Sequence, residues 1–151
     1  MSSEWLPLET GRHQDHIIAH VLGATALGYF EFDQAAHILL DIGFFWTIFI
    51  DGEMALVLQS LAIKEFELEA DLKSALSEDV QALQSGVRDN DDLSCLVRAP
   101  AGCLIKEVGV YAREESRRIL ITGEEASLEI IGSLSSGEIL IIPEPAESGR
   151  A

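Results

Sequence analysis

The chain has 151 residues, a length typical of one domain rather than two. Hydrophobic residues make up 48% of it, which is enough for a core and excludes a wholly disordered chain. The 26 acidic and 10 basic residues give a formal net charge of -16. This charge excludes nucleic-acid binding and attachment to an anionic membrane through charge attraction.

The sequence favours a soluble cytoplasmic protein. Residues 1–11 contain neither a basic start nor an apolar segment, so we expect no signal peptide. The two cysteines, Cys95 and Cys103, are too few for a disulfide framework, and we expect both as reduced thiols in strands of the core. The longest apolar run, residues 42–50, is much shorter than the ~20 residues of a membrane-spanning helix.

The first predicted element is a helix over residues 12–22, after a flexible tail of residues 1–11. Ile17 and Val21 recur at helical spacing and form one apolar face. Gly23 follows at the position where a left-handed residue commonly ends a helix.

A group of strands is predicted next, over residues 26–32, 36–42, 44–50 and 53–58. The pair Asp51-Gly52 lies between two apolar runs and predicts a hairpin with a two-residue turn. The strand before this turn is apolar on both faces, which indicates a central strand. One of its faces must therefore be covered by a later helix or by another subunit.

The second half repeats this order of elements. A helix is predicted over residues 70–84, and a polar loop at residues 86–92 offers a possible subdivision. The remaining strands are expected over residues 93–98, 103–112, 118–122, 127–132 and 138–142, before a mobile tail at 143–151. The predicted fold class is α+β: an N-terminal helix, an antiparallel β-meander, a second helix and a second antiparallel β-meander. Residues 12–142 are expected to form one domain.

Histidines provide the clearest chemical pattern in the sequence. His13, His16 and His20 are spaced three and four residues apart, so they share one stripe of the predicted helix. Two imidazoles at this spacing can bind one divalent ion from successive turns. The same pattern also arises on an ordinary solvated helix face.

A metal site would need further ligands from the first meander. His37 is a candidate, and Glu31 or Asp41 is expected on the same face of the sheet. A site of His16, His20, His37 and Glu31 would suit zinc, nickel or iron(II).

Other chemical signals are weaker. No nucleophile motif is present, so catalysis is not expected from the sequence. Arg98 and the arginines within residues 113–118 form a modest basic patch, which balances nearby acids or contacts an anionic partner.

The sequence leads to three functional hypotheses. The first is a small acidic binding or assembly module that acts through a self-associated or partner-associated β-sheet, most simply as a homo-oligomer. The second is a metal-binding protein or metal-dependent enzyme that uses the histidine cluster. The third is a pocket protein for a small apolar ligand, suggested by the aromatic run at residues 44–49.

Overall fold

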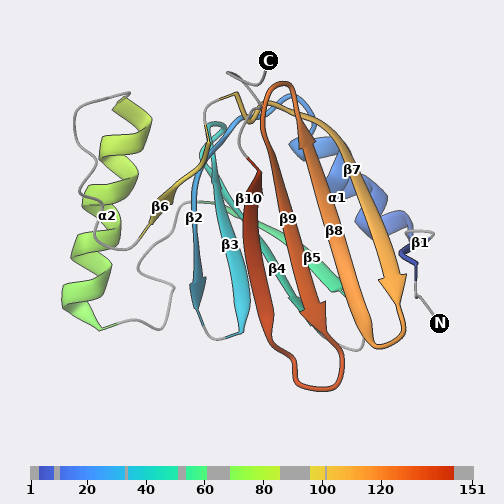
Figure 1. Cartoon of the computed structure of the whole chain (residues 1–151). Helices are drawn as coiled ribbons and strands as arrows, with labels where there is room; N and C mark the ends of the chain where they lie inside the picture. Colours follow the sequence, from blue (N-terminus) through green and yellow to red (C-terminus); the bar gives the residue numbers. More distant parts are fainter. Residues whose placement is uncertain are drawn as a thin grey trace, which may run out of the picture.

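The protein is a sandwich of two five-stranded antiparallel sheets with one helix at each side (Figure 1). The computed structural model describes residues 4–8, 11–32, 34–50, 54–60, 69–85, 96–100 and 102–144. Within these ranges, no helix is long and apolar enough to cross a membrane.

The strands of the first sheet all lie within residues 26–98, and those of the second lie within residues 105–144, except for the N-terminal strand Leu6–Pro7, which joins the second sheet. The first sheet has the order β5-β4-β3-β2-β6 and the second has the order β1-β7-β8-β9-β10. The strands of the first sheet are β2 (Ala26–Phe32), β3 (Ala35–Leu40), β4 (Phe44–Ile50), β5 (Met54–Ser60) and β6 (Val97–Arg98). Those of the second are β1 (Leu6–Pro7), β7 (Ile105–Arg113), β8 (Ser116–Gly123), β9 (Ser127–Ser133) and β10 (Ile139–Glu144).

The predicted fold class and its order of helices and meanders are confirmed. Helix α1 (Arg12–Val21) and helix α2 (Ala70–Ser85) lie where helical spacing placed them. Gly23 has a φ of +88°, as expected for a left-handed residue just after a helix.

The main core lies between the two sheets and beside α1. Alternate residues of β3, β4, β8, β9 and β10 point into it, including Trp46 and Ile38 from the first sheet and Ile119 and Ile130 from the second. Helix α1 lies beside β5 and adds Ile17 and Val21 to the same core. Both halves of the chain therefore share one core.

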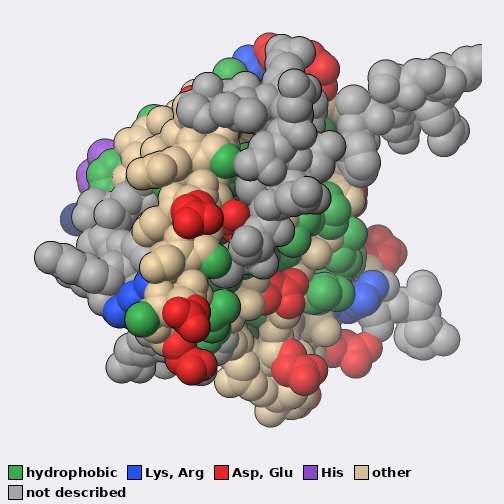
Figure 2. All heavy atoms as spheres, turned by 90° about the vertical axis from the view of Figure 1, so that its left-hand side faces the viewer, with side chains coloured by type: hydrophobic (Ala, Val, Ile, Leu, Met, Phe, Trp, Pro, Cys, Tyr) green, Lys and Arg blue, Asp and Glu red, His purple; other side chains and the backbone are tan. Residues whose placement is uncertain are grey.

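A second, smaller core lies between the first sheet and α2. Phe30, Leu39 and Phe45 point away from the main core and pack with Leu76, Val80 and Leu83 of α2. Figure 2 shows the side of the molecule that carries α2, where acidic side chains are scattered and hydrophobic ones emerge between them. The apolar face of β4 is thus covered by a helix of the same chain, one of the two covers expected from the sequence.

A buried carboxylate helps to fix α2. Asp79 is only 4% exposed, and its Oδ2 accepts a hydrogen bond from the Leu96 amide at 2.9 Å. This bond ties the helix to the segment that leads into β6, so α2 is held by polar as well as apolar contacts.

The β4–β5 hairpin is confirmed, but its register differs from the predicted one. Ile50 pairs with Met54, so three residues connect the pair, where a two-residue turn would leave two. The expected turn residues, Asp51 and Gly52, lie outside the described part of the chain.

The ends of the described chain are more ordered than expected. Leu6 and Pro7, expected in a tail, pair with Ala112 and Tyr111 as an edge strand. At the other end β10 continues to Glu144, beyond the predicted strand end. Backbone pairing with neighbours distant in sequence explains both differences. The predicted loop at residues 86–92 lies outside the described ranges.

Candidate functional site

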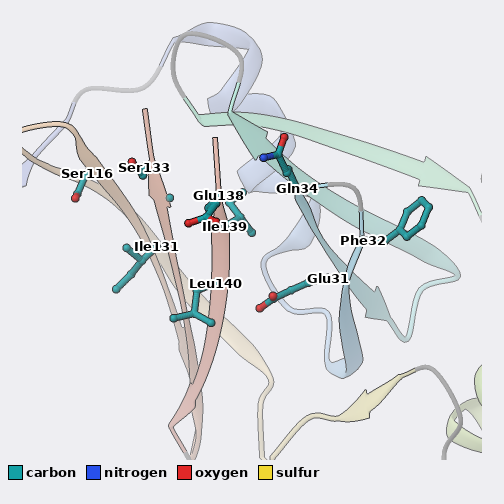
Figure 3. A pocket seen from close by; sticks show the side chains of 10 residues that line it. Glu31, Phe32, Gln34, Ser116, Ile131, Ser133, Glu138, Ile139 and Leu140 are labelled. Carbon is teal, nitrogen blue, oxygen red and sulfur yellow. The ribbon is translucent and has the colours of Figure 1, made fainter. Parts of the chain in front are cut away.

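A cleft of about 510 Å³ lies between the end of β2 and the strands β8 to β10 (Figure 3). Five polar side chains and four apolar ones line it, together with a glycine. The lining residues are Glu31, Phe32, Gln34, Ser116, Ile131, Gly132, Ser133, Glu138, Ile139 and Leu140.

Two turns far apart in sequence build the wall of the cleft. Gln34 in the β2–β3 turn has a φ of 59°, a left-handed conformation that favours tight turns. Its Nε2 donates a hydrogen bond to the carbonyl of Ser136 at 3.4 Å, in the turn between β9 and β10. This bond links the two sheets at the mouth of the cleft.

Glu31 connects the cleft to the edge of the second sheet. One of its carboxylate oxygens accepts a hydrogen bond from the Ile141 amide at 2.8 Å. The negative charge of Glu31 also adds to burial in raising the pKa of Tyr29. With Glu138 on the opposite wall and no cationic side chain in the lining, the cleft carries negative charge.

The outer surface of the second sheet adjoins the cleft, and we call it the open face. It consists of the side chains of β7 to β10 that point away from the main core. Strand register arranges them in four rows across the sheet. The first three rows are Arg113, Ser116, Ser133 and Glu138; Tyr111, Arg118, Ile131 and Leu140; and Gly109, Leu120, Glu129 and Ile142. The fourth row continues the β8–β9 register one residue beyond its last pair, Ile121 and Leu128, and contains Glu107, Thr122, Ser127 and Glu144.

No described helix covers the open face (Figure 1). By contrast, α2 packs against the outer side of the first sheet, and the two inner sides pack against each other. Leu140 is 53% exposed on the open face, and it also lines the cleft. The open face and the cleft therefore form one continuous surface.

Aromatic and arginine side chains gather at the β7 side of the open face. The Arg113 guanidinium lies 4.3 Å from the centre of the Trp5 ring. The Arg118 guanidinium lies 5.7 Å from the rings of both Trp5 and Tyr111, and it forms an ion pair with Glu129. Both members of this ion pair are largely shielded from solvent, so the pair adds little net charge to the middle of the face.

Known proteins offer no guide to this surface. No family model, curated protein or solved structure matches the chain.

The residues predicted to bind a metal are distributed over different parts of the fold. His16 and His20 are exposed on α1, with ring centres 4.9 Å apart. His37 is buried on the outer side of the first sheet, where its Nδ1 lies 3.0 Å from Thr47 Oγ1 and its ring stacks on Phe30. The side chain of His13 lies outside the described part of the structure.

The expectation that Glu31 faces His37 is wrong. In the β2–β3 register His37 pairs with Phe30 and Glu31 pairs with Ala36, so Glu31 and His37 point to opposite faces of the sheet. Asp41 lies at the far end of β3, where its Oδ1 accepts a hydrogen bond from the Thr25 amide. Among the described residues, no three His, Cys, Asp or Glu side chains are grouped to hold a metal ion.

The aromatic run and Cys103 belong to the core. Phe45 and Trp46 are fully buried on opposite sides of β4. Cys103 is also fully buried, and burial raises the pKa of its thiol to about 11, so it is not a reactive thiol. Cys95 lies outside the described ranges.

The cleft and the open face were not predicted from the sequence. Strand patterning places Leu140 and Ile142 on one side of β10, and this alternation is the signal that an apolar outer surface leaves. Nothing local shows that no helix of the described residues covers this side, because contacts between distant segments determine which face a helix covers.

Proposed function

We propose that this protein is a binding or assembly module that attaches to another protein molecule through the open face. The observation that carries the proposal is that this sheet surface has no described helix over it, whereas α2 covers the corresponding surface of the other sheet. The sequence contains no nucleophile motif, so the proposal is for binding rather than catalysis, and it includes the cytoplasmic location expected from the sequence.

The composition of the open face suits a protein interface. Tyrosine, tryptophan and arginine are enriched in such interfaces, and here the Arg118 guanidinium lies over the rings of both Tyr111 and Trp5. Leu140 and Ile142 add apolar area at the opposite side. The net charge of -16 keeps the protein from associating nonspecifically, so binding requires a complementary surface.

Site-specific photo-cross-linking in the producing cell tests this proposal. A benzophenone amino acid replaces Leu140 on the open face or, as the matched control, Leu72 on α2, which is 44% exposed. We expect one discrete cross-linked protein, identified by mass spectrometry, from the Leu140 position and not from the Leu72 position. Introducing Ile142→Glu beside the probe should suppress it.

The opposite result would overturn the proposal. If both probe positions gave the same products, or if Ile142→Glu left the product from the Leu140 position unchanged, the open face would not be the binding surface.

A second candidate is a small-molecule site in the cleft, favoured by its volume, which lies within the range of ~300–1,000 Å³ typical of such sites. Because Glu31 and Glu138 line the cleft and no cation does, its ligand would be neutral or cationic rather than purely apolar. Thermal melts with a panel of small amines and neutral polyols test it. A stabilisation that disappears in Glu138→Gln would support the candidate, and no shift with any of the compounds would contradict it.

A further inference from the structure

The open face contains two halves of different chemistry. Its β7 side presents Arg113 beside Trp5 and Tyr111, which is cationic and aromatic. Its β10 side presents Leu140 and Ile142 with Glu138, and the acidic cleft lies just beyond, so this side is apolar and anionic.

We propose that the protein molecule bound at the open face is a second copy of this chain, an inference that rests on the proposed function. The two copies would be related by a two-fold axis that runs close to the strand direction, between β8 and β9. Such an axis makes a closed dimer in which both copies use the same surface. It is also compatible with face-to-face sheet packing, in which strand directions differ by about 30°.

Rotation about this axis exchanges β7 with β10 and β8 with β9. Each row of the open face then meets the same row of the second copy in reverse order. In the first row Arg113 lies opposite Glu138 of the second copy, and in the second row Tyr111 lies opposite Leu140. Each of these contacts occurs twice, so opposite charges and apolar groups meet on both sides of the axis.

The middle of the interface needs no further charge partner. Arg118 and Glu129 already form an ion pair within one chain, and each is largely shielded from solvent. A second copy covers this pair without leaving a lone charge buried, which would be costly.

The cleft completes the interface. Trp5 lies on Arg113 beyond the β7 side, so the rotation carries it beyond β10 of the second copy, where the cleft lies. The apolar walls of the cleft suit an indole ring, and Glu31 can accept a hydrogen bond from the indole N–H.

The open face by itself is too small for a stable interface, so the cleft is needed to enlarge the contact. Four strands at ~4.8 Å spacing and seven residues at ~3.3 Å rise cover about 19 Å by 23 Å. That is smaller than the ~800 Å² per partner of a stable interface. Trp5 on one side and the cleft on the other enlarge the surface symmetrically.

A foreign partner fits this surface less well. A basic partner would meet Arg113, and an acidic one would meet Glu138 and the cleft, because both signs of charge lie on one face. In a second copy, the anionic β10 side meets the cationic β7 side of the first copy, and the cationic β7 side meets the anionic β10 side. The least favourable contact is in the fourth row, where Glu107 lies opposite Glu144 of the second copy.

Sedimentation equilibrium on the full chain, from micromolar to sub-millimolar concentration, tests the proposal by charge reversal. We expect wild type to dimerise, and Arg113→Glu or Glu138→Arg alone to raise Kd about tenfold or more, because like charges then meet twice. An equimolar mixture of the two single variants should dimerise again, because each variant supplies the charge that the other one lacks. Leu72→Glu on α2 is the matched control and should leave Kd unchanged.

The mixture of the two variants also distinguishes the proposed axis, along the strands, from a two-fold axis perpendicular to them. An axis perpendicular to the strands places Arg113 opposite Glu107 of the second copy, so mixing the two variants would not restore the dimer. Thermal melts of each variant show that the folded state is retained.

Fluorescence gives an independent reading. The chain has two tryptophans, and Trp46 is fully buried. A change in tryptophan emission when the copies associate therefore reports the surroundings of Trp5. We expect the emission to shift to shorter wavelength with rising concentration, and Glu138→Arg, which weakens the dimer, to move this shift to higher concentration.

Three results would overturn the inference. They are a monomer at every concentration, a mixture that stays monomeric, or an emission spectrum that is independent of concentration. If the photo-cross-linking from Leu140 nonetheless captured one specific foreign protein, the proposed function would stand and only the choice of partner would be wrong.

Discussion

Gly123, at the end of β8, lies where the backbone leaves no room for a side chain. A Cβ built there would be 2.0 Å from the Ala126 carbonyl oxygen and 3.0 Å from the Cys103 Cα. Both atoms are backbone and cannot move without shifting the sheet. We expect Gly123→Ala to lower the free energy of unfolding by about 1–3 kcal/mol, measured by urea denaturation.

Gly109 provides the comparison for this prediction. The three atoms nearest to an added Cβ there all belong to the Tyr111 side chain, the closest being its hydroxyl oxygen at 2.8 Å, and a side chain can shift more readily than backbone. Gly109→Ala should therefore cost less than Gly123→Ala. Equal losses of stability would show that the close backbone approach at Gly123 is not the cause.

The buried Cys103 thiol predicts how stability depends on pH. Its pKa is about 11 in the folded protein, above the ordinary value of 9.0, because burial disfavours the thiolate. The contribution of this group is fully present below pH 9 and is lost as pH rises toward 11. One pKa unit corresponds to ~1.36 kcal/mol, so the loss is on the order of 2–3 kcal/mol.

Cys103→Ala tests this assignment. The variant should be less stable at neutral pH, because a buried sulfur is removed, but its stability should fall less between pH 9 and pH 11. Tyr29, whose pKa is also raised by burial and by Glu31, steepens the loss above pH 10 in both proteins. Denaturant titrations across this pH range measure the difference, and parallel curves would contradict it.

At the scale of elements, α2 is attached through a core of its own. Leu76 is fully buried in the smaller cluster with Phe45 and Leu39, whereas Leu72, one turn earlier, is 44% exposed. We expect Leu76→Ala to cost about 2–5 kcal/mol and to speed amide hydrogen exchange in α2 more than in β8. Leu72→Ala should change stability by less than about 1 kcal/mol. Uniform acceleration across the chain would mean that α2 does not open separately.

The sequence predicts most elements because their signals are local. Both helices and the strands β2 and β4 lie within a residue or so of their predicted ends, since apolar periodicity and glycine punctuation occur within each segment. The sandwich itself could not be predicted. Which strands become neighbours, and which sheet face α2 covers, depends on contacts between distant segments.

The candidate site escaped prediction for the same reason. Glu31 was expected to point toward His37, but this assumed the wrong pairing across the β2–β3 hairpin, and one step in register reverses a side chain. Gln34 and Ser136 meet although they are 102 residues apart. Only the fold reveals that the two turns form one wall.

At the scale of the whole molecule, the charge of -16 opposes the association of two copies. The proposed interface adds to this opposition where Glu107 meets Glu144. We therefore expect Glu144→Gln to tighten the dimer by about twofold to fivefold, because it removes one like-charge contact on each side of the axis. Sedimentation equilibrium in parallel with wild type measures the change, and weaker association would contradict the proposed arrangement of rows.

The hydrogen bond from the Ile141 amide to Glu31 has a consequence for growth of the sheet. β10 is an edge strand, and an exposed edge is a template on which further chains can add to form fibrils. Here Glu31 occupies the outward amide of Ile141, and Pro143, two residues on, has no amide hydrogen to donate. Removing the carboxylate in Glu31→Ala should open this edge and promote thioflavin-positive aggregates, whereas Glu138→Ala should not. In this apolar sequence, a carboxylate from the opposite sheet and a proline would thus together protect the edge of β10 from amyloid-like polymerisation.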